Sequence, residues 1–233
     1  MEWNIENNYQ EWNKEITNIE EKMKLATKVA SFVKDGDTIG FGSGSTSFLA
    51  IKEIAKKISE EGISITAIPT SYEIKMLCNS LNIPTASIIE KKPDWSFDGA
   101  DEVDQNGWLI KGRGAAMYKE KLNILNSEKV YILVDNTKIV DELGKKFSIP
   151  VECYPESVNY VTEQLNKLGA TECALRMAKE KDGPVITENN NFIIDCKFEK
   201  IDKNLEKELK LITGVIETGL FVGYSNIEIV KVM

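Results

Sequence analysis

Strand-like and helix-like segments alternate along the first two thirds of the chain, with short polar loops between them. Residues 37–42 (DTIGFG) are typical of a short buried strand, and residues 48–60 (FLAIKEIAKKISE) are typical of an amphipathic helix. The alternation continues through SITAIPT, SYEIKMLCNSL, DWSFDGA, GAAMYKEKLNILNS and VYILVD. Such a pattern predicts an α/β fold in which helices cover both faces of a mostly parallel sheet.

The polar loops of this region come directly after the predicted strands. GSGSTS follows the first strand, TSYE the second, DGADEVD the third and VDNTK the fourth. The carboxyl ends of parallel strands meet at one edge of a sheet, and ligands of open α/β sheets bind beyond that edge. We therefore expect the binding residues in these four loops.

The pattern changes after Ser148, which indicates a second structural unit. The new segments mix strands and helices: IPVECYP, SVNYVTEQLNKLG, CALRMA and KNLEKELKLI. Residues 184–198 predict a β-hairpin that turns at its asparagines. We expect a smaller α+β domain over residues 147–212, inserted into a larger domain over residues 1–146 that residues 213–233 complete. These last residues are β-rich and are expected to return to the first sheet.

Charge and residue usage exclude several classes of function. The formal net charge is −8, whereas nucleic acids and anionic membranes bind basic surfaces. The chain has no histidine, so a general base has to be Asp, Glu, Lys, Cys or Tyr. The four cysteines form no closely spaced pair, which disfavours a zinc site. No apolar run is long enough to span a bilayer, and we place the protein in the cytoplasm.

The glycine and hydroxyl loop at residues 42–46 (GSGST) joins a strand to a helix. Its backbone amides and the hydroxyls of Ser43, Ser45 and Thr46 can converge on an anion at the helix N-terminus. The alternative is a tight turn with Ser45 or Thr46 as the helix cap.

The acidic segment at residues 98–104 (DGADEVD) places four carboxylates within seven residues. Asp98 and Asp101 lie at the end of a predicted strand, where they can accept hydrogen bonds from sugar hydroxyls or bind a divalent metal. A solvated acidic turn is the alternative.

The segment at residues 110–121 (IKGRGAAMYKEK) combines a glycine loop with a helix start. It offers Lys111, the amides of residues 112–114 and, one helical turn beyond the loop, Glu120. The alternative is that residues 119–121 only solvate the helix. Lys138 is a further cation at the same predicted sheet edge, unless it is an ordinary surface lysine.

Together these segments provide hydroxyls and amides for a phosphate, lysines for its charge, and carboxylates for polyol binding and proton transfer. Redox chemistry would need a cofactor-binding motif, which the sequence lacks. Isomerisation of an aldose phosphate to a ketose phosphate needs only a base and donors that stabilise an enediolate.

Four blocks in fixed order carry a resemblance to a known family: GSGST, FDGADEVDQNGWLIKGRGAAMYKEK, VDNTKIVDELGKKFSIPVE and ITGVIETGLFVG. Over about residues 20–225 the chain resembles type A ribose-5-phosphate isomerase. The resemblance implies a Rossmann-like domain with an inserted α+β domain, assembled as a homodimer or homotetramer. It implies interconversion of D-ribose 5-phosphate and D-ribulose 5-phosphate through a cis-enediol, without metal or organic cofactor, in the non-oxidative pentose phosphate pathway.

The resemblance also implies roles for individual residues. Glu120 is the expected proton acceptor, and Lys111 is expected to bind substrate and stabilise developing negative charge. Asp98 and Asp101 are expected to assist ring opening and hold hydroxyls. The expected substrate contacts are Ser43, Gly44, Ser45, Thr46, Asp98, Gly99, Ala100, Asp101, Lys111, Gly112, Arg113, Gly114 and Lys138. Lys22 also aligns with a lysine near the family's pocket.

The chain departs from the family pattern at three positions. Ser43 replaces a threonine but keeps the hydroxyl, and Thr213 replaces a proline. Arg113 interrupts a run of glycines, where its side chain either blocks close backbone approach or supplies a phosphate contact. Two other functions therefore stay open: isomerisation of a different phosphorylated sugar, and a non-catalytic sugar-phosphate-binding module. The retained Glu120 disfavours the second, because a binding module needs no base.

Overall fold

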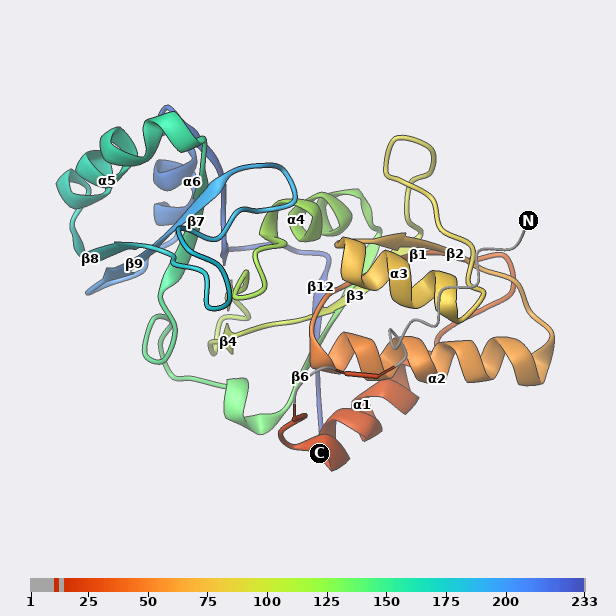
Figure 1. Ribbon diagram of the computed structural model, residues 1–233. Helices are drawn as coiled ribbons and strands as arrows, with labels where there is room; N and C mark the ends of the chain where they lie inside the picture. The colour runs from red at the N-terminus through yellow and green to blue at the C-terminus, as the bar shows by residue number, and fades with distance from the viewer. Residues whose placement is uncertain (1–10, 13–14, 233) are drawn as a thin grey trace. The chain divides into compact units, whose positions relative to one another are not determined.

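The computed structural model describes residues 11–12 and 15–232 (Figure 1), and the chain divides into two compact units. Of the described residues, unit 1 contains those up to Gly99, together with Leu122–Asp135 and residues 228–232. Unit 2 consists of Ala100–Lys121 and Asn136–Ile227.

Unit 1 is built on a five-stranded sheet with the strand order β12-β6-β3-β1-β2. Its strands are β1 (Thr38–Phe41), β2 (Thr66–Pro69), β3 (Trp95–Gly99), β6 (Lys129–Val134) and β12 (Ile227–Lys231). The pairs β1 with β2, β1 with β3, and β3 with β6 are all parallel. The predicted mostly parallel sheet is thus confirmed, and β12 is the part of the C-terminal segment that belongs to it.

The helices of unit 1 lie on both faces of this sheet. They are α1 (Ile19–Ala30), α2 (Ser45–Glu61) and α3 (Tyr72–Ser80), and α4 (Met117–Asn126) is divided between the units after Lys121. The chain leaves β1 for β2 through α2, then passes to the other side of β1 through α3. Because such crossovers are right-handed, α2 and α3 cover opposite faces. The reversal at β1 makes the gap between β1 and β3 the switch point of the sheet.

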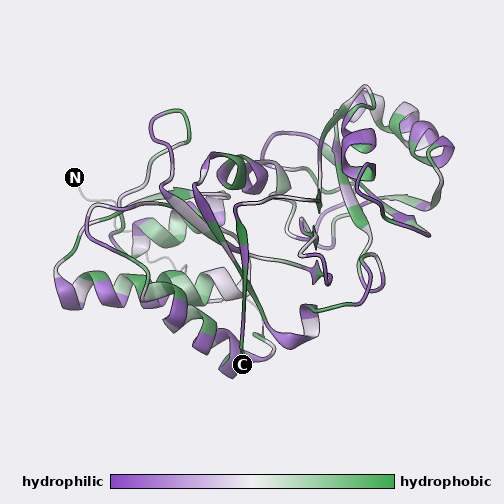
Figure 2. Ribbon diagram, turned by 180° about the vertical axis from the view of Figure 1, so that it is seen from behind, coloured by the Kyte–Doolittle hydropathy of each residue, from purple (hydrophilic) through white to green (hydrophobic). Residues whose placement is uncertain are grey.

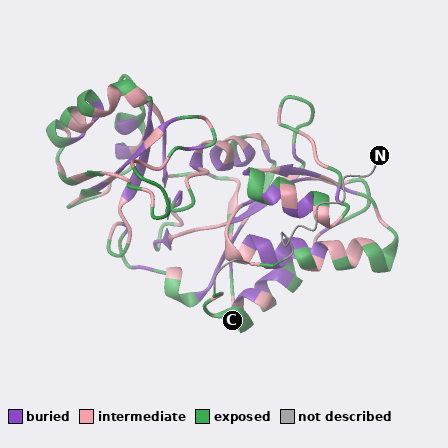
Figure 3. Cartoon of the chain, viewed as in Figure 1, coloured by how far each residue is buried: buried purple, intermediate pink, exposed green. Residues whose placement is uncertain are grey.

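Local sequence accounts for these elements. Helix α2 buries Phe48, Ile51 and Ile54 on one side and exposes charged residues on the other (Figure 2). It ends at Gly62, whose φ of 68° is the left-handed conformation that glycine adopts without a steric penalty. The strands that α2 covers are buried (Figure 3), and Phe41 packs against Phe97 with ring centroids 5.1 Å apart.

Unit 2 contains two small antiparallel sheets and two helices of its own. One sheet has the order β10-β7-β9-β8 and the other β11-β5-β4. The strands are β4 (Glu102–Val103), β5 (Leu109–Ile110), β7 (Ile149–Cys153), β8 (Ala170–Leu175), β9 (Phe192–Phe198), β10 (Val215–Thr218) and β11 (Leu220–Phe221). The helices are α5 (Val158–Lys167) and α6 (Leu205–Lys210), with short 3-10 turns η2 (Asn136–Lys138) and η3 (Pro155–Ser157).

The predicted hairpin over residues 184–198 is wrong in its first arm. Only β9 forms a strand, and it pairs with β7 and β8 rather than with residues 184–191. The preceding residues instead form a turn around the buried carboxylate of Glu152. Its Oε1 accepts hydrogen bonds from Thr187 Oγ1 at 2.7 Å and from Asn191 Nδ2 at 2.9 Å. The backbone of these residues forms its hydrogen bonds elsewhere than with β9: the Val185 amide donates to the Arg176 carbonyl at 2.8 Å, and the Thr187 amide donates to the Asn191 carbonyl at 2.9 Å.

The strands of the C-terminal segment belong to three different sheets, whereas the sequence predicts that the segment returns to the first sheet. β10 pairs with β7 and β11 with β5, both in unit 2, while only β12 joins the parallel sheet. By compactness, residues 100–121 and 136–146 also group with unit 2, whereas the sequence assigns them to the larger domain. The domain boundaries at residues 147 and 212 stay a prediction.

Candidate active site

The predicted site residues belong to both units. Unit 1 holds Ser43, Gly44, Ser45, Thr46, Asp98 and Gly99. Unit 2 holds Ala100, Asp101, Lys111, Gly112, Arg113, Gly114, Glu120 and Lys138. In unit 1, residues 43–46 follow the carboxyl end of β1, and Asp98 and Gly99 are the last two residues of β3. In unit 2 most of the predicted residues lie between β4 and the first turns of α4.

In unit 1, Asp98 lies directly against the start of the glycine loop. Its side chain is buried, and its Oδ1 accepts a hydrogen bond from the Gly99 amide at 2.7 Å. A Cβ atom on Gly42 would lie 2.2 Å from Asp98 Cγ and 2.6 Å from its Cα, so only glycine fits. The Gly42 amide donates to the Phe97 carbonyl at 2.9 Å. Gly42 thus brings the two strand-end loops together, a role that its sequence position alone does not reveal.

We expect Gly42→Ala to lower both stability and activity. The new methyl group overlaps the backbone of Asp98, so strand β1 or β3 has to shift, at a cost of about 1–3 kcal/mol in unfolding free energy. Urea unfolding measures that cost, and an assay of isomerisation measures the displacement of Asp98. An unfolding midpoint equal to that of the wild type would contradict the close approach.

The hydroxyls of unit 1 form a connected group at the same strand ends. Ser43 Oγ lies 2.8 Å from Thr70 Oγ1 and donates to Ser71 Oγ at 2.9 Å. Thr70 in turn donates to the Phe41 carbonyl at 3.0 Å. Thr70 and Ser71 follow β2, so three consecutive parallel strands contribute polar groups. The loop after β2 therefore takes part through Thr70 and Ser71, whose roles depend on contacts with β1 and its loop.

Helix α2 begins with an arrangement suited to an anion. Its N-cap is Gly44, which adopts a φ of 98° and has no side chain to occupy the first free amides. Ser45, the first helical residue, accepts a hydrogen bond from Lys22 Nζ at 3.1 Å. Lys22 comes from α1 and is only 5% exposed. A buried ammonium, a hydroxyl and a helix N-terminus together favour a bound phosphate.

In unit 2, Lys111 and Glu120 form a buried ion pair. Lys111 Nζ lies 3.4 Å from Glu120 Oε2, and the two side chains are 3% and 6% exposed. The Glu120 amide donates to the Ala116 carbonyl at 3.0 Å, in the first turn of α4. The alternative in which residues 119–121 merely solvate the helix is wrong for Glu120 and Lys121. It suits only Lys119, which is partly exposed and pairs with Glu188 at 2.7 Å.

The loop between Lys111 and α4 makes a tight turn. Gly112 adopts a φ of 96° and Ala115 a φ of 65°, and the Ala115 amide donates to the Gly112 carbonyl at 3.1 Å. Asp101 Oδ2 accepts a hydrogen bond from the Arg113 amide at 3.0 Å. The Arg113 side chain is 68% exposed, with Nε 3.8 Å from Asp101 Oδ1. The arginine therefore extends outward from the loop.

Glu102, the acid after DGAD, organises the loop that carries Lys138. Its carboxylate is fully buried and accepts amide hydrogen bonds from Gly144 at 2.6 Å, Lys146 at 2.5 Å and Phe147 at 2.8 Å. Lys138 Nζ lies 5.2 Å from the centroid of the Phe147 ring. The solvated acidic turn is thus the wrong interpretation for Glu102, because three donors replace its water.

Lys121 anchors the helix that carries Glu120. It is buried, and its Nζ lies 2.7 Å from Glu206 Oε1, 3.0 Å from Glu217 Oε1 and 3.0 Å from the carbonyls of Thr218 and Leu220. Burial by itself raises the pKa of Glu217. The charge of Lys121 and the hydrogen bonds from Thr218 and Lys121 outweigh burial, so the pKa is lowered overall.

This lowered pKa predicts an acid-dependent loss of stability. A carboxylate with a depressed pKa in the folded state stabilises the fold above its ordinary pKa, and that contribution is lost as the pH falls through the depressed value. We expect the unfolding free energy to fall below about pH 4.5, and to fall less steeply in Glu217→Gln. Urea unfolding between neutral pH and about pH 3 tests this expectation. Parallel pH profiles for the two proteins would contradict it.

The cysteines are unsuited to act as bases. Burial raises the pKa of Cys78 to about 12 and that of Cys153 to about 11, and it also raises the pKa values of Cys173 and Cys196. Among residues 11–12 and 15–232, no group of three or more Cys, Asp or Glu side chains is placed to hold a metal ion.

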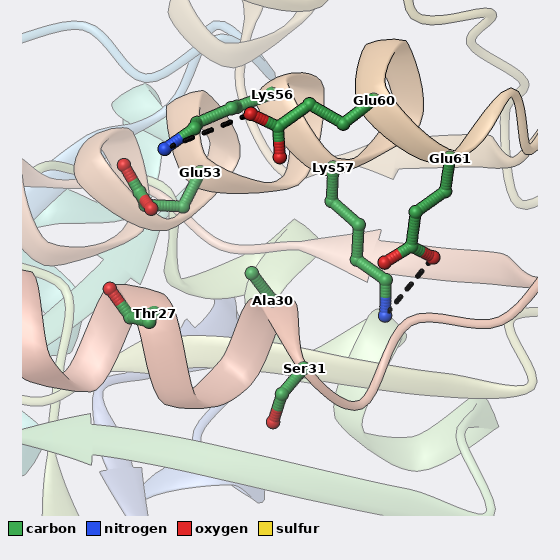
Figure 4. A pocket seen from close by; sticks show the side chains of 8 residues that line it. All are labelled: Thr27, Ala30, Ser31, Glu53, Lys56, Lys57, Glu60 and Glu61. Carbon is green, nitrogen blue, oxygen red and sulfur yellow. Dashed lines mark ion pairs between the residues drawn. The ribbon is translucent and has the colours of Figure 1, made fainter.

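A separate shallow groove lies between α1 and α2 of unit 1. Its walls are formed by Thr27, Ala30, Ser31, Glu53, Lys56, Lys57, Glu60 and Glu61 (Figure 4). The ion pairs Lys56–Glu60 and Lys57–Glu61, each with a separation of 3.9 Å, connect residues one turn apart on α2. The first pair is exposed, whereas Lys57 is largely covered and also donates to the Val33 carbonyl at 2.8 Å. The groove contains none of the predicted site residues.

In the part of the chain that the structure describes, no helix has the length and apolar character needed to span a lipid bilayer.

Comparison with known proteins gives consistent matches. The family model of ribose 5-phosphate isomerase A (phosphoriboisomerase A) matches residues 66–231. The ribose-5-phosphate isomerase A of Methanocaldococcus jannaschii is 43% identical over 209 residues, which cover 88% of this chain and 92% of that protein. The ribose-5-phosphate isomerase A of Pyrococcus horikoshii is 44% identical over 218 residues, which cover 91% of this chain and 95% of that protein.

Solved structures agree with these sequences. The structure of ribose 5-phosphate isomerase A from Methanocaldococcus jannaschii matches with a TM-score of 0.88 at 40% identity, covering 91% of this chain and 95% of that chain. A D-ribose-5-phosphate isomerase in complex with phospho-erythronic acid matches with a TM-score of 0.86 at 43% identity and the same coverage. The matches span most of both partners, and the chain belongs to the ribose 5-phosphate isomerase A family.

Proposed function

We propose that this chain interconverts D-ribose 5-phosphate and D-ribulose 5-phosphate through a cis-enediol intermediate. The observation that carries the proposal is the buried Lys111–Glu120 pair beside a tight glycine turn, in a member of this family. Aldose-ketose isomerisation moves one proton between two neighbouring carbons, so it needs a base and a means of stabilising the negative charge that develops.

Glu120 is the proposed base. Its carboxylate removes the proton from C2 of the open-chain aldose, and the electron pair of that bond forms the C1–C2 double bond as the C1 carbonyl becomes an enediolate oxygen. The carboxyl of Glu120, whose proton exchanges in part with water, then protonates C1, while the C2 hydroxyl passes its proton to the oxygen on C1 and C2 becomes the carbonyl. The Lys111 ammonium, 3.4 Å from Glu120 Oε2, stabilises the negative charge of the enediolate.

The start of α2 is the proposed phosphate site. Lys22, Ser45 and the amides of the first turn supply positive charge and donors for a dianionic phosphate. Asp98 and Asp101 are proposed to hold sugar hydroxyls and assist ring opening, with the loop from Lys111 to Gly114 and Lys138 as further substrate contacts. Phospho-erythronic acid, bound by a 43% identical relative, combines a phosphate with a planar carboxylate that resembles an enediolate.

A second candidate is the same chemistry on a different phosphorylated sugar. The specific observation is Arg113, which is 68% exposed, extends outward from the loop and lies beside Asp101. A guanidinium at this position can recognise a phosphate that a run of glycines would leave uncontacted. Asp101 partly neutralises it in the present arrangement, which favours ribose 5-phosphate as the main substrate.

A substrate panel tests the proposal. Purified protein is assayed with ribose 5-phosphate and with four-carbon, five-carbon and six-carbon aldose phosphates of other configuration, with and without a chelator. We expect the highest kcat/KM with ribose 5-phosphate and no effect of the chelator, because the proposed mechanism uses no metal. A preference for another sugar phosphate would support the second candidate. Saturable binding without turnover of any of them would support a binding module.

The cellular setting follows from this function. We propose a cytoplasmic enzyme of the non-oxidative pentose phosphate pathway, assembled as a homodimer or homotetramer and active without a cofactor. Size-exclusion chromatography with light scattering measures the assembly.

A further inference from the structure

Arg176 contacts the substrate loop from the end of strand β8. Its Nη1 donates to the Gly112 carbonyl at 2.9 Å and to the Arg113 carbonyl at 3.1 Å. The other edge of the guanidinium faces Asp195 of β9, with Nε 2.8 Å from Oδ2 and Nη2 2.5 Å from Oδ1. The guanidinium of Arg176 thus links the sheet β10-β7-β9-β8 of unit 2 to two consecutive peptide units of the loop.

The geometry of this contact is well defined. Both side chains are largely covered, with 17% of Arg176 and 28% of Asp195 exposed. The two-point pair with Asp195 fixes the plane of the guanidinium, which a single hydrogen bond would leave free to rotate. The backbone of Arg176 is held as well, because its amide donates to the Ile193 carbonyl at 2.8 Å.

The loop that Arg176 contacts is a strained turn. Gly112 has a φ of 96°, and Ala115 has a φ of 65°, which a residue with a Cβ atom rarely adopts. Such a turn persists only where surrounding contacts hold it. Asp101 holds the loop by accepting the Arg113 amide, and Arg176 holds it by donating to the Gly112 and Arg113 carbonyls.

The contact with Arg176 also affects how strongly the Gly114 amide of the loop can donate a hydrogen bond. The Arg113 carbonyl belongs to the same peptide unit as the Gly114 amide. A charged donor on that carbonyl polarises the peptide unit and makes its amide hydrogen a stronger donor. The Gly114 amide lies in the loop proposed to contact substrate, so the guanidinium can act on an anionic oxygen without touching it.

We propose that Arg176, held by Asp195, is a positioning residue for isomerisation, which orders and polarises the Lys111–Gly114 loop. The proposal rests on the proposed function, because it assigns Arg176 a role in the same reaction. It requires a guanidinium: a lysine ammonium can satisfy one or two of the acceptors but cannot reach Asp195 and both carbonyls in one plane.

Steady-state kinetics of Arg176→Ala and Arg176→Lys test the proposal. We expect kcat/KM for ribose 5-phosphate to fall on the order of 10- to 100-fold in both, as small displacements of catalytic groups produce. Added guanidinium ion should restore part of the rate of Arg176→Ala, whereas sodium chloride at equal ionic strength should not. A purely structural role would predict that the lysine variant, which keeps a cation next to Asp195, recovers activity together with its melting temperature.

The matched control is Lys197→Ala. Lys197 pairs with Glu172 at 2.8 Å across the same two strands, and its carbonyl accepts a hydrogen bond from Thr171, so both partners lie on β8 rather than on the loop. Its kcat/KM should stay within about twofold of the wild type. If Arg176→Ala does not fold, the lysine variant carries the test alone. Unchanged kcat/KM in the Arg176 variants of an active enzyme would overturn the proposal, whereas an inactive wild type would contradict the proposed function instead.

Discussion

Glu120→Gln is expected to lower kcat for ribose 5-phosphate by a factor of about 10²–10⁴. The amide has nearly the same shape as the carboxylate, but it cannot accept the C2 proton. The side chain is 6% exposed, so water has little room to replace it as the base. Because the change is isosteric, KM should change much less than kcat. The melting temperature should fall as well, because Lys111 loses its buried counter-charge, so kcat is measured well below the melting temperature of the variant to separate the loss of the base from the loss of stability.

A matched control for this substitution is Glu163→Gln. Glu163 also lies on a helix and pairs with a lysine, Lys167, at 2.6 Å, but both side chains are more than half exposed. We expect it to keep wild-type kcat. Equal activity in Glu120→Gln and the wild type would remove Glu120 as the base, and a fall that merely tracked the melting temperature would assign it a structural role.

Lys121→Met is expected to lower the unfolding free energy by about 3–5 kcal/mol. The substitution keeps most of the apolar length of the side chain but removes its ammonium, which lies 4.5 Å from the centroid of the Phe221 ring. It leaves the carboxylates of Glu206 and Glu217 without their common cation. Total stabilities are typically about 5–15 kcal/mol, so urea unfolding should show a large fall in the midpoint.

The control for this substitution is Lys167→Met. The Lys167–Glu163 pair is short, but the lysine is 63% exposed, and such pairs contribute at most about 1 kcal/mol. Equal losses of unfolding free energy in the two variants would show that the burial of the Lys121 ion pairs adds nothing to stability. Double substitution of Lys121 and Glu217 by apolar residues should recover part of the loss, because it removes one of the two carboxylates that share Lys121.

The parallel half of the fold was predictable because its periodicity is strong. The apolar segment at 37–42 and the amphipathic segment at 48–60 are found as β1 and α2. The smaller unit was less predictable, since its elements are short and depend on contacts distant in sequence. The clearest case is residues 184–191, which have strand-like composition but wrap around Glu152, 35 to 39 residues away.

The candidate site was predictable where residue type alone indicates chemistry. The acids of DGAD and the lysine and glutamate of IKGRGAAMYKEK were identified in this way, and the resemblance then supplied their expected roles. Supporting residues were not predictable, because their roles are spatial. Gly42 leaves room for the side chain of Asp98, and Glu102 accepts hydrogen bonds from amides more than 40 residues later in the chain. Arg176 donates to carbonyls of a loop more than 60 residues earlier.

The central claim is that a carboxylate moves a proton through an enediol, and hydrogen exchange during turnover tests it most directly. Ribose 5-phosphate is incubated with the enzyme in heavy water, and the ribulose 5-phosphate formed is analysed by NMR. We expect deuterium at C1 of the product and, at equilibrium, at C2 of the substrate, both lost in Glu120→Gln. Rapid turnover with complete retention of the substrate hydrogen would indicate a direct hydride shift and contradict the account.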